Sequence, residues 1–162
     1  MGLEYGVRII PEIDIPAHSL AFAHYKPEIA SRKYGMDHLD LYKKETYQFV
    51  DSLLDEYLSG DNPVFIGDLH IGTDEYNKKE AEQYRYFTDR YLKFVEKYGK
   101  NVRMWGGLKW LPGKTPVKAE GVTVNAWSYD WVDPVVSLQD GYKLINTCLL
   151  YTSPSPRDTE RS

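Results

Sequence analysis

Several residue types and patterns are scarce in this 162-residue chain. It has one cysteine, Cys148, which excludes an internal disulfide framework and a cysteine-rich metal site. It lacks the run of roughly 20 apolar residues that crosses a bilayer, so we expect no membrane segment. The net charge of -4 comes from interspersed charges of both signs. Because there is no basic stripe to attract phosphates, we expect no nucleic-acid partner.

Motifs for metals and nucleotide cofactors are also missing. The histidines, at positions 18, 24, 38 and 70, show neither H-E-x-x-H nor any other tight ligand spacing, so no metal is expected. A G-x-G-x-x-G or Walker-type loop is absent as well, which argues against a nucleotide cofactor. What the chain does have is aromatic side chains, 14 Tyr and 4 Trp. Such flat rings can pack in a core or against the face of a sugar.

Strands and helices are predicted to alternate along the chain. Apolar and β-branched runs predict strands at 7–16, 64–71, 101–105, 122–127 and 142–145, and helical periodicity predicts helices at 44–58, 78–98 and 133–139. Such alternation is typical of an α/β fold with a mostly parallel sheet, either open or part of a (β/α)8 TIM barrel. Motifs at the ends of successive strands favour the barrel. A complete barrel takes about 250 residues, so a partial barrel, truncated at both ends, is predicted.

The C-terminal tail has a different character. Residues 148–158 match one reading frame of a common transposase-type sequencing adapter. We therefore divide the chain into a barrel fragment, residues 1–147, and a non-native tail, residues 148–162. The alternative is a genuine Ser/Pro-rich linker.

Two motifs carry the chemistry. Residues 11–18 read P-E-I-D-I-P-A-H, and residues 70–75 read H-I-G-T-D-E. Together they resemble family 20 glycoside hydrolases, the β-N-acetylhexosaminidases, in which P-E-I-D-x-P-G-H ends the third barrel strand and H-x-G-G-D-E ends the fourth. Here Ala17 and Thr73 stand where the family usually has glycine, so each adds a Cβ at a backbone turn. The resemblance places the chain from about strand 3 to the start of strand 7.

The resemblance implies that Asp74 and Glu75 are the catalytic residues. It implies a substrate-assisted retaining mechanism, in which the substrate's own acetamide is the nucleophile and an oxazolinium intermediate forms. Glu75 would act as general acid and base, and Asp74 would orient the acetamide. An Asp-Glu dipeptide alone is more often solvated surface. The preceding strand, which delivers the pair to a strand end, is what favours catalysis.

Four further residues are predicted to bind substrate. The resemblance implies that His18 and Asp14 support the bound sugar and the acid through hydrogen bonds, and that Trp105 and Trp127 line the acetamide pocket and sugar subsite. The alternatives are a loop histidine satisfied by backbone, a loop-capping aspartate and core tryptophans. Tyr129 and Trp131 are weaker candidates for a distal sugar platform, the Tyr84, Tyr91 and Tyr98 stripe is read as helix packing, and His70 is expected to be structural.

The predicted parent enzyme releases terminal, non-reducing β-linked N-acetylglucosamine or N-acetylgalactosamine from glycans. The fragment itself is expected to have at most trace activity, because it needs the missing parts of its own barrel. Two alternatives stay open. One is a non-catalytic carbohydrate-binding remnant, and the other is a different enzyme of the same family, such as a lacto-N-biosidase or a chitin-directed exo-enzyme.

Overall fold

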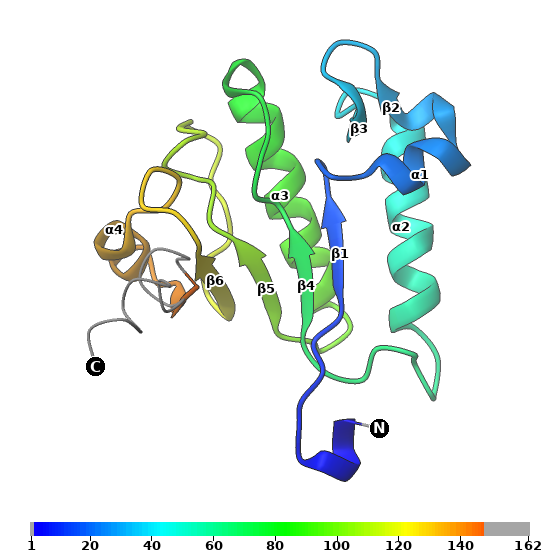
Figure 1. Ribbon diagram of the computed structural model, residues 1–162, viewed down its shortest axis with the longest axis vertical. Coiled ribbons are helices and arrows are strands. Elements are labelled where there is room, and N and C mark those ends of the chain that lie inside the picture. Colours follow the sequence, from blue (N-terminus) through cyan, green and yellow to red (C-terminus); the bar gives the residue numbers. More distant parts are fainter. Residues whose placement is uncertain (1, 148–162) are drawn as a thin grey trace, which may run out of the picture.

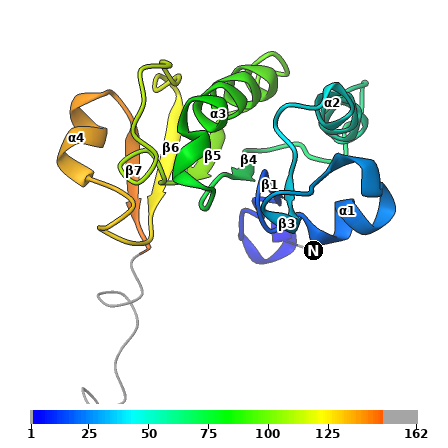
Figure 2. The ribbon, with the colours of Figure 1, turned by 90° about the horizontal axis from the view of Figure 1, so that it is seen from above.

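The computed structural model describes residues 2–147 and has a five-stranded parallel sheet at its centre. Its strands, in spatial order, are β1 Glu12–Ile15, β4 Leu69–Gly72, β5 Val102–Trp105, β6 Val122–Ala126 and β7 Lys143–Asn146. Every neighbouring pair is parallel. The strands follow one another across the sheet in chain order (Figure 1), and seen from above they form a curved wall (Figure 2). The predicted partial TIM barrel is therefore confirmed.

Two long helices cover the convex side of this wall, as Figure 2 shows. They are α2 Lys44–Leu58 and α3 Ala81–Glu96. The remaining elements are α1 Leu20–Tyr25, α4 Pro134–Gln139, the two-stranded β2 Ala30–Ser31 and β3 Gly35–Leu39, and the 3-10 segments η1 Gly2–Tyr5, η2 Pro27–Ile29 and η3 Lys78–Glu80. Among the described residues, none of these helices has the length and apolar character needed to cross a membrane.

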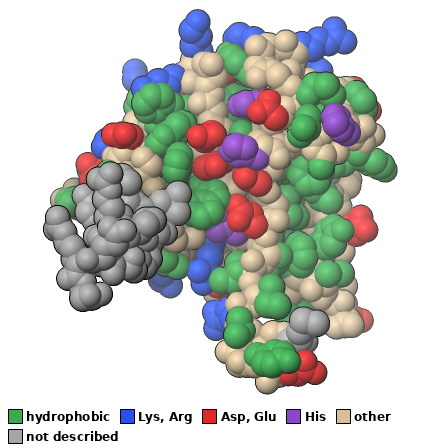
Figure 3. All heavy atoms as spheres, in the orientation of Figure 1, with side chains coloured by type: hydrophobic (Ala, Val, Ile, Leu, Met, Phe, Trp, Pro, Cys, Tyr) green, Lys and Arg blue, Asp and Glu red, His purple; other side chains and the backbone are tan. Residues whose placement is uncertain are grey.

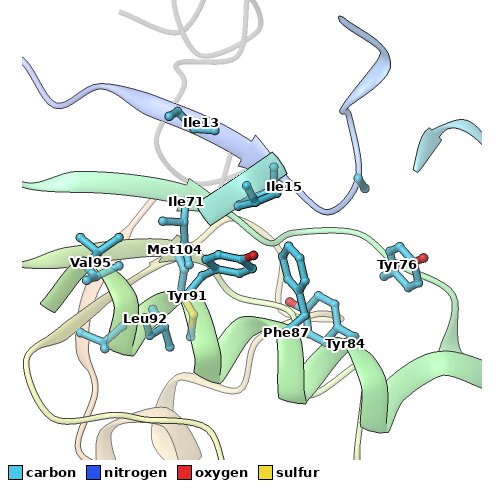
Figure 4. Close-up of a cluster of buried hydrophobic side chains, with 14 of the residues drawn as sticks. Ile13, Ile15, Ile71, Tyr76, Tyr84, Phe87, Tyr91, Leu92, Val95 and Met104 are labelled. Carbon is cyan, nitrogen blue, oxygen red and sulfur yellow. The ribbon is translucent and has the colours of Figure 1, made fainter. Parts of the chain in front are cut away.

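The apolar core lies between the sheet and these helices. Ile13 and Ile15 of β1 and Ile71 of β4 are buried in one core cluster with side chains of α3. From α3, the side chains of Tyr84, Phe87, Tyr91, Leu92 and Val95 are buried against them, as the close-up in Figure 4 shows. Tyr98 is partly buried against the same core. Tyr84 and Tyr91 thus pack the helix against the core beneath the sheet, as their spacing predicted, whereas Tyr98 lies two residues beyond the end of the helix.

The opposite face of the sheet is polar. Strand side chains alternate between the two faces, and the positions that alternate with the buried apolar ones hold mostly polar residues. In β1, Glu12 and Asp14 alternate with the buried isoleucines. One row crosses the sheet through paired residues, namely Glu12, His70, Arg103, Thr123 and Lys143. In a closed barrel this face lines the interior, where sites are built from strand ends.

Two strands are shorter than the sequence predicted. Residues 7–11 precede β1 and residues 64–68 precede β4 without being strands themselves. Both runs are rich in β-branched residues, yet Val7, Ile9, Val64 and Ile66 are each more than half exposed. A strand needs a hydrogen-bonded neighbour as well as propensity. The first neighbouring pairs in register are Glu12 with His70 and Leu69 with Val102, so the ladder starts there.

The segment between residues 19 and 39 was not predicted to hold regular structure. It contains the short helix α1 and the β2–β3 hairpin. These elements are only two to six residues long, which is too short for a periodic apolar pattern to stand out. The last residue of β3, Leu39, is hydrogen-bonded to both motif loops, through Pro16 and Tyr76. By contrast, the predicted helix at 133–139 is confirmed, with Asp133 capping it through the amides of Val135 and Val136.

Candidate active site

The two motif loops lie side by side at the C-terminal ends of β1 and β4. Ile15 and Gly72 are register partners, and the amide of Thr73 donates to the carbonyl of Ile15 at 3.0 Å. Each loop turns through a residue in the left-handed region, His18 with φ of 53° and Thr73 with φ of 67°. Figure 3 shows acidic and histidine side chains gathered over these strand ends. The parallel pairing therefore brings together two motifs more than 50 residues apart in the chain.

His18 contacts both carboxylates of the Asp-Glu pair. Its Nε2 atom lies 3.3 Å from Oδ2 of Asp74 and 3.2 Å from Oε2 of Glu75. Partial burial acts to lower the pKa of His18, but the carboxylates of Asp74, Asp14 and Glu75 outweigh it, so the pKa is raised. A protonated ring donates to these oxygens and offsets the repulsion between neighbouring anions.

The carboxylate of Asp14, on β1, lies within 4.8 Å of ligand atoms of both His18 and Asp74. Burial, and then the charge of Asp74, raise the pKa of Asp14 to about 7. Its Oδ1 atom is buried without a hydrogen-bond partner among the described residues, as is Oδ1 of Asp74. The structure thus brings Asp14, His18, Asp74 and Glu75 together, and the pKa is raised at two of them, Asp14 and His18. Perturbed pKa values of this kind cluster at functional sites.

The same geometry bears on metal binding. Asp14, His18 and Asp74 offer ligand atoms that all lie within 4.8 Å of one another. Such a donor set of two carboxylates and an imidazole can hold a divalent cation. Ligands must be deprotonated to bind a metal, and burial and neighbouring charges raise the pKa of Asp14 and of His18, so a cation at this position would compete with protons.

Gly72 permits the close approach of the two strands. It has a φ of 70°, and a Cβ placed on it would lie 1.8 Å from Oδ1 and 2.7 Å from Cα of Asp14. The other usual glycine positions of the motifs hold larger residues. Thr73 accepts the left-handed conformation with its side chain fully buried, and its hydroxyl donates to the carbonyl of Gly72 at 2.6 Å. Ala17 is 2% exposed.

Trp105 belongs to a hydrogen-bonded group on the polar face of the sheet. Its indole N–H donates to Oε1 of Glu12 at 2.7 Å, and its ring lies 4.9 Å from that of His70. Nδ1 of His70 accepts the amide proton of Gly72 at 3.1 Å. Burial and then Arg103 lower the pKa of His70 to about 4, so its 3.4 Å approach to Glu12 is a contact of a neutral ring. His70 is thus held by a buried hydrogen bond within its own strand, in keeping with the structural role expected of it.

Trp127 contacts a different set of partners. It is the first residue after β6, and its indole N–H donates to the carbonyl of Gly106 at 3.0 Å. Its ring lies 5.4 Å from Trp131, which lies 4.8 Å from Trp110. The ammonium of Lys78 lies 3.2 Å from the centre of the Trp110 ring. The loops after β5 and β6 are therefore joined by an aromatic cluster, while Tyr129 lies exposed at 43%.

Sequence reasoning did not single out Glu12, Tyr76, Tyr84 or Trp110 as site residues. Glu12 was inside a quoted motif, but its partner Trp105 lies 93 residues away. Tyr84 was assigned to the core on its spacing. This is correct for its ring, but the spacing did not reveal that its hydroxyl donates to the carbonyl of Thr73. A local pattern carries no information on such long-range contacts.

Comparison with solved structures shows the same fold in family 20 enzymes. A β-N-acetylhexosaminidase from Streptomyces coelicolor A3(2) is 27% identical, with a TM-score of 0.69 over 88% of this chain and 30% of that one. A mutant Streptomyces plicatus β-hexosaminidase, in complex with the product GlcNAc, is 26% identical, with a TM-score of 0.65 over 85% of this chain and 29% of that one.

Curated relatives agree. A lacto-N-biosidase from Bifidobacterium bifidum is 28% identical over 93% of this chain and 16% of its own length, and a β-hexosaminidase from Arthroderma benhamiae is 29% identical over 89% of this chain and 29% of its own. The chain thus spans less than a third of the length of either relative. Residues 1–152 match the model of the glycosyl hydrolase family 20 catalytic domain. The chain belongs to glycosyl hydrolase family 20.

Proposed function

We propose that the protein containing this chain hydrolyses terminal, non-reducing β-linked N-acetylhexosamine residues of glycans. One observation carries the proposal. Asp74 and Glu75 stand at the mouth of β4 with Nε2 of His18 within 3.3 Å of both, in a chain of family 20. The mouth of a barrel strand is where enzymes of this architecture place their catalytic groups.

The two carboxylates differ in exposure, and this difference fits two roles. The side chain of Glu75 is 44% exposed, while that of Asp74 is 18% exposed. Glu75 is assigned as the general acid that protonates the glycosidic oxygen and then, as carboxylate, removes a proton from the attacking water. Asp74 is assigned to the substrate acetamide, where a carboxylate shielded from water interacts more strongly with developing charge.

The proposed reaction uses the substrate's own nucleophile. The acetamide carbonyl oxygen attacks the anomeric carbon as the bond to the leaving oxygen breaks, which forms an oxazolinium. Asp74 accepts a hydrogen bond from the acetamide N–H and stabilises the positive charge. Water activated by Glu75 then attacks the anomeric carbon from the opposite side to the acetamide oxygen, so the configuration is retained overall. The mechanism requires no protein nucleophile.

The substrate-binding residues have proposed places in this scheme. His18 and Asp14 are proposed to keep a proton next to the carboxylate pair, since the pKa of each is raised there. Trp105, held by Glu12, supplies an apolar wall on the polar sheet face. Trp127, fixed to Gly106, supplies a second wall from the neighbouring loop. Apolar walls remove water from the acetamide and direct its oxygen.

Activity is proposed to need more of the barrel than this chain contains. β1 and β7 are the edges of the five-stranded sheet, and open edges expose unpaired backbone groups. The polar face also carries buried atoms without partners among the described residues, such as Nε2 of His70 and Oδ1 of Asn125. Further strands of the same barrel are the partners proposed for these groups. Residues 148–162, which lie outside the described residues, are proposed to be a non-native tail, although the family match extends through residue 152.

A second candidate is a lacto-N-biosidase-type activity, favoured by the similarity to the Bifidobacterium bifidum protein. Such an enzyme releases a disaccharide rather than a single N-acetylhexosamine. The two activities share the acetamide chemistry and differ in the space beyond the first sugar. The third candidate, a carbohydrate-binding remnant, would keep the tryptophan walls and hydrolyse nothing.

The test uses the full-length protein and three 4-nitrophenyl glycosides. The proposal predicts hydrolysis of the N-acetyl-β-glucosaminide and none of the β-glucoside, which lacks the acetamide nucleophile. Hydrolysis of the lacto-N-bioside alone would establish the second candidate. Binding of N-acetylglucosamine without any hydrolysis would establish the remnant. Equal turnover of the glucosaminide and the glucoside would contradict substrate assistance.

A further inference from the structure

Two tyrosine hydroxyls fix the backbone on either side of the Asp74–Glu75 pair. Before the pair, the hydroxyl of Tyr84 on α3 donates to the carbonyl of Thr73. After the pair, the hydroxyl of Tyr76 donates to the carbonyl of Leu39 in β3 at 2.7 Å. Both tyrosines are buried, at 1% and 6% exposure. The pair is thus held by one hydrogen bond to a helix and one to a hairpin.

The carbonyl that Tyr84 reaches belongs to an unusual residue. Thr73 is a fully buried β-branched residue with φ of 67°, a conformation that costs energy for such a side chain. Such a conformation persists only where the surroundings over-determine it. Gly107 packs closely against the same segment, and only a glycine leaves the room. A Cβ there would lie 2.9 Å from the Tyr84 hydroxyl, 3.0 Å from the carbonyl oxygen of Asp74 and 3.3 Å from that of Thr73.

Tyr76 links the two motif loops through Leu39. The carbonyl of Leu39 accepts from Tyr76, and its amide donates to the carbonyl of Pro16 at 2.8 Å. Pro16 lies two residues before His18. The backbone of one residue in β3 therefore connects the loop of the carboxylates to the loop of the histidine. The rings of Tyr76 and Tyr84 stack on each other at 6.3 Å, and Figure 4 shows them at one end of the core.

We propose that Tyr76 and Tyr84 are positioning residues that set the spacing between His18 and the carboxylates of Asp74 and Glu75. Neither tyrosine takes part in the reaction itself. The two hydroxyls act through the backbone of Thr73 and Leu39, and their loss lets the Asp74–Glu75 segment move relative to His18. The catalytic consequence rests on the proposed hydrolase function, whereas the geometric one does not.

The test compares Tyr76→Phe and Tyr84→Phe with Tyr91→Phe in the full-length protein. Tyr91 is a matched control on α3, because it is fully buried and its hydroxyl lies 3.1 Å from Oδ1 of Asp51, on the α2 side of the core. Each variant removes one hydroxyl and keeps the ring. For each, kcat and KM on an aryl N-acetyl-β-glucosaminide, urea unfolding and the pKa of His18 by NMR are measured.

The expected result is a split between the variants. Tyr76→Phe and Tyr84→Phe lower kcat by about 10- to 100-fold, since a displacement on the order of 1 Å costs about that much, while KM changes less. The pKa of His18 falls toward its ordinary value in both, because the carboxylates that raise it have moved away. Tyr91→Phe loses a comparable amount of stability and leaves kcat and the His18 pKa unchanged.

Other outcomes distinguish a failure of the positioning role from a failure of the proposed hydrolase function. If the wild type hydrolyses no acetamido sugar but the His18 pKa still falls in both site variants and not in Tyr91→Phe, the positioning role stands and the proposed function fails. If kcat and the His18 pKa in the site variants match those of Tyr91→Phe, the positioning role is overturned. Should Tyr84→Phe not fold, Tyr76→Phe decides by the same measurements, and loss of folding in both overturns positioning in favour of a purely structural role.

Discussion

Replacing Gly72 by alanine tests the contact between the two motif strands. Gly72 and Gly99 share nearly the same left-handed backbone, with φ of 70° and 69°. An alanine in that region costs about 1–2 kcal/mol. At Gly99 no atom of the described residues lies within 4 Å of the added Cβ, so this is the whole cost. At Gly72 the Cβ would meet Oδ1 of Asp14 at 1.8 Å and its Cα at 2.7 Å.

That overlap cannot be relieved by a side-chain rotation alone, because the Cα atom belongs to the neighbouring strand. Overpacking of this kind lowers the free energy of unfolding by about a further 1–3 kcal/mol. We therefore expect Gly72→Ala to lower the free energy of unfolding by about 2–5 kcal/mol and Gly99→Ala by about 1–2 kcal/mol. The assay is urea unfolding of the chain followed by circular dichroism. Equal losses in the two variants would refute the close approach of β1 and β4 described here.

Three further predictions follow from the site. Burial and the charge of Asp74 raise the pKa of Asp14 from 3.8 to about 7. The native state therefore binds more protons than the unfolded state between these values, and the free energy of unfolding falls as pH rises from about 4 to 7. Asp14→Asn should flatten that slope in unfolding curves measured at several pH values, and an unchanged slope would show that Asp14 is not its source. Glu12→Leu removes the acceptor of the Trp105 indole N–H, and the lost hydrogen bond, at about 0.5–1.5 kcal/mol, should raise KM of the full-length protein several-fold. Glu12→Gln keeps an acceptor oxygen and should not raise KM, so equal KM values in the two variants would contradict this. Purified residues 1–147 should show at most trace hydrolysis, and robust turnover would contradict the need for further strands.

The sequence predicted the fold where local pattern and tertiary contacts agree. The helix expected at 44–58 has the observed bounds, because its apolar face is also its buried face. The strands expected at 7–16 and 64–71 were too long at their starts, since propensity extends further than the neighbouring strands do. The β2–β3 hairpin was missed because its strands are too short to show a periodic pattern and because its contacts with the motif loops, such as the Leu39 amide to the Pro16 carbonyl, are not visible in a local pattern.

The site was predicted in part for a similar reason. Asp14, His18, Asp74 and Glu75 come together because parallel strands align their C-terminal ends, which the order of the motifs implied. The partners of these residues were not foreseeable in the same way. The Trp105 contact with Glu12 and the Tyr84 contact with Thr73 depend on side-chain directions across elements, and the sequence pattern specifies elements rather than contacts.

Asp74 and Glu75 are proposed to perform the chemistry. The direct measurement is hydrolysis of an aryl N-acetyl-β-glucosaminide by the full-length protein and by its Asp74→Asn and Glu75→Gln variants, with Glu56→Gln, an exposed carboxylate on α2, as the control. We expect the wild type and the control to hydrolyse the substrate and each site variant to lose about 100-fold or more in kcat. Site variants that fold normally and keep full activity, or a well-folded wild type that hydrolyses none of this substrate, would contradict it.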